Sequence, residues 1–149
     1  MLMPLSLLLV STAAAAHGPT GQCAVVTVRS PQAPHGTTQR FSAARILDVE
    51  FGTALRKRLS GAHVLNLRVY TPKGHLYQEL SVAFDAGQPV GASDAAEEAR
   101  RRQPRMVARL PVGGTSITNA SLFGRWKVVP HLDLSQRPCS AASVFTIAP

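Results

Sequence analysis

Two stretches of alternating apolar and polar residues, joined by a short turn, most constrain the fold of this chain. In residues 62–70 leucine and valine alternate with polar neighbours, and the pattern resumes in residues 75–84. Between them, Thr71-Pro72-Lys73-Gly74 combines a proline, whose φ is fixed, with a glycine that tolerates positive φ. Side chains with a period of two lie on one face of a strand, so this segment predicts a β-hairpin with one buried face.

The alternation assigns the hairpin side chains to two faces. We expect seven apolar side chains on the inward face: Leu65, Leu67, Val69, Leu76, Leu80, Val82 and Phe84. The opposite face is polar and includes Asn66, Arg68 and Tyr77. One exposed tyrosine is weak evidence for a carbohydrate site, so Tyr77 is not assigned a function.

Five further stretches have the length and composition of short strands. They cover residues 23–29, 45–51, 105–112, 125–134 and 144–147. In 45–51 the expected inward residues are Leu47, Val49 and Phe51. In 125–134 they are Trp126, Val128, Leu132 and Leu134, opposite Arg125, Lys127, His131 and Asp133. The only tryptophan of the chain is therefore expected in the core.

The remaining segments are predicted as connections. Residues 30–38 contain two prolines and a glycine, and we interpret 52–61 as an exposed loop. The charged segment near residues 94–103 has a possible capping box and no apolar face, so it is a short surface helix or a charged loop.

About seven short strands separated by turns, with almost no helix, are typical of an all-β, immunoglobulin-like antiparallel β-sandwich. A length of 149 residues indicates one domain, which we assign to residues 17–149.

The hairpin and the segment after residue 110 also carry a family resemblance. In HVLNLRVYTPKGHLYQELSVAF a strand ends in Tyr-x-Pro-x-Gly followed by Leu-Tyr, and later Leu-Pro-Val-x-Gly-Thr precedes Gly-x-Trp-x-Val. These features resemble secreted bacterial immunoglobulin-like or macroglobulin-like β-sandwich domains of exported proteobacterial proteins. The resemblance covers residues 62–147. It implies the fold, export, and a role in adhesion, binding or spacing, without a catalytic motif.

Residues 1–16 predict a secretory signal peptide. They hold an uncharged apolar run followed by small residues that end in Ala14-Ala15-Ala16, although no Lys or Arg precedes the run. The run is shorter than the roughly 20 residues that span a bilayer, so cleavage would leave no transmembrane segment. We therefore expect an extracytoplasmic protein, either periplasmic, at the cell surface or secreted.

The two cysteines, Cys23 and Cys139, lie near the two ends of the predicted mature chain. In an oxidising compartment an even number of cysteines favours a disulfide. Two unpaired, buried cysteines are the alternative.

The formal net charge is +8, and arginine supplies 13 of the 16 basic residues. The densest basic segment holds five arginines: Arg100, Arg101, Arg102, Arg105 and Arg109. This cluster could bind phosphates or acidic polysaccharide, although a solvated loop paired with Glu97 and Glu98 is the alternative interpretation. Aromatic residues are absent from the cluster and the protein is expected to be exported, so we do not expect nucleic-acid binding.

Histidines suggest a second possible chemistry. If the signal is cleaved after Ala16, His17 becomes the N-terminus and could bind copper through its amine and imidazole, as in copper-brace proteins. A second ligand would come from His35, His63, His75 or His131. His131 and Asp133 also share one predicted strand face, as a metal or acid–base pair would require. A solvated polar face is the ordinary alternative.

No sequence motif predicts catalysis. There is no G-x-S-x-G motif, a disulfide would leave no free thiol, and the eight acidic residues form no evident catalytic pair. We therefore expect a monomeric, non-catalytic binding or structural module that needs no cofactor and has an extracytoplasmic protein or polysaccharide partner.

Overall fold

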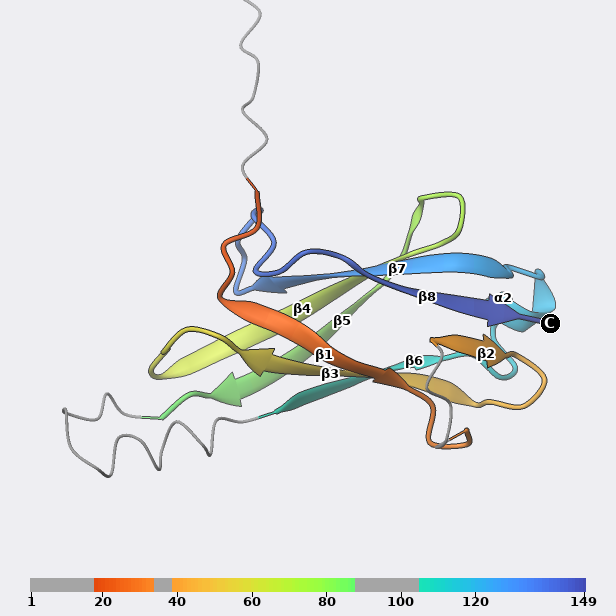
Figure 1. Ribbon diagram of the computed structural model, residues 1–149, viewed down its shortest axis with the longest axis horizontal. Coiled ribbons are helices and arrows are strands. Elements are labelled where there is room, and N and C mark those ends of the chain that lie inside the picture. The colour runs from red at the N-terminus through yellow and green to blue at the C-terminus, as the bar shows by residue number, and fades with distance from the viewer. Residues whose placement is uncertain (1–17, 34–38, 88–104) are drawn as a thin grey trace, which may run out of the picture.

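The computed structural model describes residues 18–33, 39–87 and 105–149, which form two β-sheets packed face to face (Figure 1). Four sequence predictions lie outside these residues: the signal peptide in 1–16, the copper ligand His17, the helix or loop in 94–103, and the arginines at 100–102. Within the described ranges, no helix is long and apolar enough to cross a membrane.

The first sheet has three antiparallel strands in the order β1-β3-β6. They are β1 (Cys23–Arg29), β3 (Asp48–Leu55) and β6 (Met106–Pro111). The strand β3 continues to Leu55, so the prediction that 52–61 is entirely a loop is wrong for its first four residues. Pairing on both edges of β3 holds these residues in the sheet despite Gly52.

The second sheet has five strands in the order β2-β8-β7-β4-β5. They are β2 (Arg40–Ser42), β8 (Ser143–Ala148), β7 (Gly124–Leu132), β4 (Ala62–Tyr70) and β5 (Leu76–Asp85). The short β2 was not predicted, and it pairs parallel to β8, so the sandwich is not purely antiparallel. Parallel pairing is possible here because a long connection separates the two strands in sequence.

The arrangement of the sheets is immunoglobulin-like. The strands β1, β3 and β6 face the sheet that contains β8, β7, β4 and β5. In immunoglobulin strand letters, this order is A-B-E against G-F-C-C′. The predicted fold class is confirmed, with one additional strand and one helical turn, α2 (Ser116–Asn119).

Aromatic residues from both sheets form the centre of the core. Phe51 of β3 meets Phe145 of β8 at a centroid distance of 5.3 Å, and Trp126 of β7 stacks on Phe145 at 6.3 Å. All three are essentially inaccessible to solvent. The indole N–H of Trp126 donates to the Leu122 carbonyl at 3.0 Å, which satisfies its only polar group. The predicted core position of Trp126 is confirmed.

A disulfide joins Cys23 to Cys139 across 116 residues, as the sequence predicted. It links the first residue of β1 to the connection between β7 and β8. Backbone bonds support this link, since Cys139 N–H donates to Pro130 and Cys23 N–H donates to Cys139. Closing a loop of this length contributes up to about 4–5 kcal/mol in the chain-entropy model.

Three leucines that were predicted to face inward lie in solvent. Leu47, Leu76 and Leu134 are 65%, 54% and 93% exposed. Leu47 precedes the first residue of β3, and Leu134 follows the end of β7. Between β7 and Leu134, Asp133 adopts a φ of 53°, which ends the strand alternation.

A bulge in β5 reverses the predicted orientation of Tyr77. This residue is the additional one between the partners of two successive β4 residues. Its ring meets Trp126 edge-on at 5.2 Å, and its hydroxyl lies 2.8 Å from Ser116 Oγ. The prediction of an exposed Tyr77 is therefore wrong, because the extra residue shifts the phase of the strand. Asn66, predicted to be outward and polar, is also buried.

Candidate functional site

The outer face of the three-stranded sheet brings together side chains that are distant in the sequence. Val49 and Phe51 are fully buried, so Glu50 and Gly52 of β3 lie on the opposite, outer face. A bulge at Val26 places Thr27 and Arg29 of β1 opposite Gly52 and Glu50, on the same outer face. The strand pairing forms two rows on this face, namely Thr27, Gly52 and Val107, and next to it Arg29, Glu50 and Arg109.

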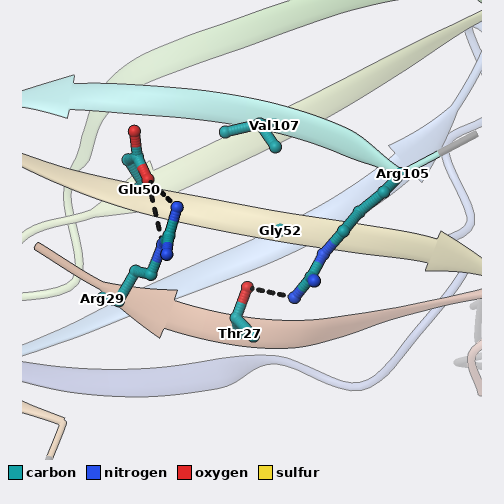
Figure 2. A pocket seen from close by; sticks show the side chains of 6 residues that line it. All are labelled: Thr27, Arg29, Glu50, Gly52, Arg105 and Val107. Atoms are coloured by element: carbon teal, nitrogen blue, oxygen red, sulfur yellow. Dashed lines mark hydrogen bonds and ion pairs between the residues drawn. The ribbon is translucent and has the colours of Figure 1, made fainter. Parts of the chain in front are cut away.

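Gly52 forms the floor of a shallow hollow of about 200 Å³ on this face (Figure 2). The side chain of Arg105 crosses the floor, and its Nη2 donates to Thr27 Oγ1 at 2.9 Å. A Cβ at Gly52 would collide with Thr27 Oγ1 and lie 3.0 Å from Arg105 Nε. Glycine at this position therefore allows a guanidinium group to lie directly against the strand.

Glu50 anchors the neighbouring row. Its side chain is only 5% exposed, whereas those of Arg29 and Arg109 are 67% and 63% exposed. Arg29 contacts Glu50 Oε2 through Nη2 at 3.0 Å and through Nε at 3.1 Å (Figure 2). Arg109 Nη2 lies 2.7 Å from Oε1. One carboxylate thus holds two guanidinium groups in place while much of each group remains open to solvent.

The face carries an excess of positive charge. Three guanidinium groups and one carboxylate leave a net charge of +2. Among the described residues, Arg105 has no acidic side chain within ion-pair distance. Guanidinium groups bind carboxylate, sulfate and phosphate groups through paired N–H donors. The arrangement can therefore bind an anion in a hollow lined by Gly52 and Val107. We name this surface, made of Thr27, Arg29, Glu50, Gly52, Arg105, Val107 and Arg109, the small-sheet face.

Sequence reasoning found two residues of the small-sheet face and missed the rest. Arg105 and Arg109 belong to the predicted arginine cluster. Arg29, Thr27 and Glu50 were not assigned because they come from strands that only the folded sheet places beside β6. Gly52 could have indicated this surface from the sequence, since an isolated glycine inside a strand often marks a place where another group approaches the backbone closely.

The sequence left a metal or acid–base pair of His131 and Asp133 beside the ordinary alternative of a solvated polar face. The structure gives the two residues separate partners. His131 is only 5% exposed, and its Nδ1 lies 3.0 Å from the Ser135 carbonyl oxygen. The residues after β7 fold back over the imidazole, so its strand face is not solvated. Within 18–33, 39–87 and 105–149, no group of three or more His, Cys, Asp or Glu side chains could hold a metal ion. His17 lies outside these ranges, so copper binding stays a prediction.

Asp133 instead pairs with His63. Its Oδ2 lies 3.0 Å from His63 Nδ1, and the other ring nitrogen, Nε2, lies 2.9 Å from the Ser60 carbonyl oxygen. Two acceptors stabilise the doubly protonated ring, and the hydrogen bond to Asp133 is the main reason that the pKa of His63 is raised. Partial burial raises the pKa of Asp133, but hydrogen bonds from His63 and the Val64 N–H outweigh it and lower the pKa overall.

The same aspartate joins the ends of two strands. Its Oδ1 accepts from Val64 N–H at 3.1 Å, and its carbonyl accepts from Asn66 Nδ2 at 2.8 Å. Its own N–H donates to the Val64 carbonyl at 2.7 Å. We name His63, Val64, Asn66 and Asp133 the Asp133 corner. These bonds account for its polar groups, which indicates a structural role for the corner.

No protein-family model and no curated protein matches this chain. Solved structures are similar to it, among them the following two. One is a proposed β-galactosidase from Bacteroides fragilis, with 15% identity and a TM-score of 0.37 over 68% of this chain; the chain spans 13% of the length of that protein. The other is an immunoglobulin-like protein from Pseudomonas aeruginosa, with 16% identity and a TM-score of 0.36, over 83% of this chain and 98% of that protein. Likeness at this level carries no statement about activity.

Proposed function

We propose that this chain is an exported, non-catalytic binding module that binds an acidic polysaccharide on the small-sheet face. The position of Arg105 is the main support for this proposal. Its guanidinium lies over Gly52, without an acidic partner among the described residues. Beside it, Glu50 holds Arg29 and Arg109 in fixed positions. Together these residues supply three cationic groups on one face of the sheet, two in the row of Glu50 and one that reaches over Gly52 in the neighbouring row.

Two features support export. The first 16 residues have the composition of a secretory signal peptide. The disulfide between Cys23 and Cys139 is the type of bond that persists in oxidising compartments outside the cytoplasm. An exported basic module meets acidic polysaccharides of cell envelopes and extracellular matrices, and sulfate or carboxylate groups on them suit guanidinium donors.

Binding to two polyanionic probes tests the proposal. Heparin carries sulfate and carboxylate groups, and polygalacturonate carries carboxylates alone, so the pair also identifies the preferred anion. Basic groups that neutralise a polyanion release condensed counterions, as is known for nucleic acids. We expect tight binding at low salt and a steep loss of affinity as the salt concentration rises.

The informative variant is Arg105→Gln, because it removes a charge that stabilises no buried carboxylate in the described structure. We expect about a fivefold loss of affinity at low salt, equivalent to ~1 kcal/mol. The slope of log affinity against log salt should decrease by about one. Lys73→Gln removes one charge in the turn between β4 and β5 and serves as the matched control. Equal losses in both variants, or binding that salt does not weaken, would overturn the proposal.

A further inference from the structure

A second row of basic side chains lies on the opposite surface of the sandwich, on the outer face of the five-stranded sheet. Trp126 and Phe145 point into the core, so their sequence neighbours Arg125, Lys127 and Thr146 lie on the outer face. The pairing of β2 with β8 adds Arg40, which lies opposite Thr146. Arg40, Arg125 and Lys127 are all exposed.

The strand register fixes the spacing of these three residues. Arg40 and Arg125 flank Thr146 in one row across β2, β8 and β7. Their Cα atoms are therefore about 10 Å apart, two inter-strand distances. Lys127 lies two residues further along β7, at about 7 Å from Arg125. Because these residues belong to paired strands, the strand register fixes the positions of their Cα atoms relative to one another.

The charge on this surface is also not neutralised. In the described structure, none of the three basic side chains forms an ion pair. The nearest acidic residue in the strand ladder, Glu79, is already paired with Arg68 at 3.1 Å. Lys127 Nζ lies over the ring of Tyr70 at 5.0 Å, which orients the ammonium group without neutralising it. We name Arg40, Arg125 and Lys127 the large-sheet triad.

We infer that the large-sheet triad is a second binding site for anionic polysaccharide, and that the two faces together allow one protein molecule to crosslink two polysaccharide chains. The inference takes its ligand class from the proposed function but concerns a different surface. The two sheets of a sandwich are stacked about 10 Å apart, and their outer faces point in opposite directions. A straight chain bound on one face therefore leaves the other face free for a second chain.

Two measurements on the whole protein test this inference. The first is the stoichiometry of a short heparin oligosaccharide by titration calorimetry. We expect two oligosaccharides per wild-type molecule and one per molecule of the triple variant Arg40→Gln, Arg125→Gln and Lys127→Gln. The second is light scattering with full-length heparin. The wild type should give a scattering maximum at an intermediate ratio of protein to heparin, and the triple variant should give none while it still binds.

The control variant removes the same number of charges from connections between strands, through Arg45→Gln, Arg56→Gln and Lys73→Gln. It should retain two binding sites and the scattering maximum. Thermal unfolding of each variant shows whether the fold is retained, and the triad residues anchor no acidic group in the described structure, so we expect an unchanged unfolding temperature.

The outcomes separate this inference from the proposed function. One oligosaccharide per wild-type molecule, with loss of binding only in Arg105→Gln, overturns the second site and supports the small-sheet face. Complete loss in the triple variant, with no effect of Arg105→Gln, shows binding at the triad alone and overturns both the proposed function and crosslinking by the two faces. Equal weakening by the triad and control variants shows attraction by net charge alone and overturns the inference.

Discussion

Two carboxylate-centred networks in this protein have opposite organisation. On the small-sheet face, a buried Glu50 holds two arginines whose guanidinium groups are largely exposed. At the Asp133 corner, a half-exposed carboxylate holds His63, which is only 20% exposed, together with backbone and amide donors of β4. The acid is hidden and the cations are exposed in the first network, whereas the second hides the cation.

This difference separates a binding surface from a structural joint. A carboxylate that is buried beneath arginines fixes their positions and leaves N–H donors free for an external anion. A carboxylate whose oxygens accept from the histidine and backbone of a neighbouring strand leaves little capacity for a ligand. Each prediction below alters one network or the disulfide. The expected losses of stability decrease in the order given, with Glu50→Gln placed beside the variant that it complements.

Removing the disulfide by Cys23→Ser with Cys139→Ser should have the largest effect. The link closes a loop across 116 residues, so we expect a loss of about 4 kcal/mol in the free energy of unfolding, measured by denaturant titration. The small-sheet face lies in paired strands, so heparin affinity of the folded protein should remain within twofold of the wild-type value. A parallel loss of affinity would show that the face depends on this link.

Removing both cations from Glu50 should have the next largest effect. The variant Arg29→Gln with Arg109→Gln leaves a buried carboxylate without compensation, and we expect a loss of about 3 kcal/mol in the free energy of unfolding. Adding Glu50→Gln should recover most of that loss, because the uncompensated charge is then gone.

Glu50→Gln alone separates two effects of Glu50, namely that it holds Arg29 and Arg109 in place and that it carries a negative charge. It should change stability little and increase heparin affinity by about fivefold, since it removes a ~1 kcal/mol repulsion between the face and an anion. Unchanged heparin binding in this variant would contradict the assignment of the small-sheet face as the binding surface, whereas weaker binding would show that the anchoring of Arg29 and Arg109 outweighs the charge of Glu50.

Filling the hollow should destabilise the small-sheet face by a smaller amount. Gly52→Ala places a methyl group against Thr27 and Arg105, and we expect a loss of about 1–2 kcal/mol in stability and weaker heparin binding. Gly18→Ala is the matched control, because nothing lies within 4 Å of its Cβ position. If Gly52→Ala binds heparin as tightly as the wild type does, the position of the Arg105 side chain over Gly52 is not required for binding.

The Asp133 corner should give the smallest effect, as a pH dependence of stability. The pKa of His63 is raised above 6.5 and that of Asp133 is lowered below 3.8. The stabilisation is therefore complete between about pH 4 and 6.5, and it is lost as the pH rises through the folded-state pKa of His63. It is also lost as the pH falls through that of Asp133. For a partly exposed pair the size is about 0.2–1 kcal/mol.

The measurement is the unfolding temperature of wild type and His63→Gln between pH 5 and pH 9. The wild type should be more stable than the variant near pH 6, and the difference should shrink toward pH 9. The ratio of the heparin affinity of the wild type to that of His63→Gln should not change with pH, because the Asp133 corner is not part of the small-sheet face. A constant difference in unfolding temperature would mean that the pair does not titrate as described.

The sequence predicted the parts of this fold that follow from strict alternation. Leu65, Leu67 and Val69 are buried as expected, and so are Met106, Ala108 and Leu110 of β6. The hairpin turn and the disulfide were also predicted. These features depend on local pattern or on cysteine number, which are properties of short segments or of the composition.

Two of the errors occur where a backbone irregularity changes the phase of a strand. An additional residue turned Tyr77 inward, and the positive φ of Asp133 exposed Leu134. The small-sheet face could not be predicted as a unit, because Arg29, Glu50 and Arg109 become neighbours only through strand pairing. Alternation indicates which side a residue occupies but does not identify its partners on neighbouring strands.

The most direct test of the central claim is a nuclear magnetic resonance titration of the protein with a short heparin oligosaccharide. If the small-sheet face binds, the backbone amides of Thr27, Gly52 and Val107 should shift, and the Arg105 side-chain Nε–H should broaden or shift. The amides of the Asp133 corner should stay unchanged. Shifts at the corner without shifts around Gly52 would contradict the account.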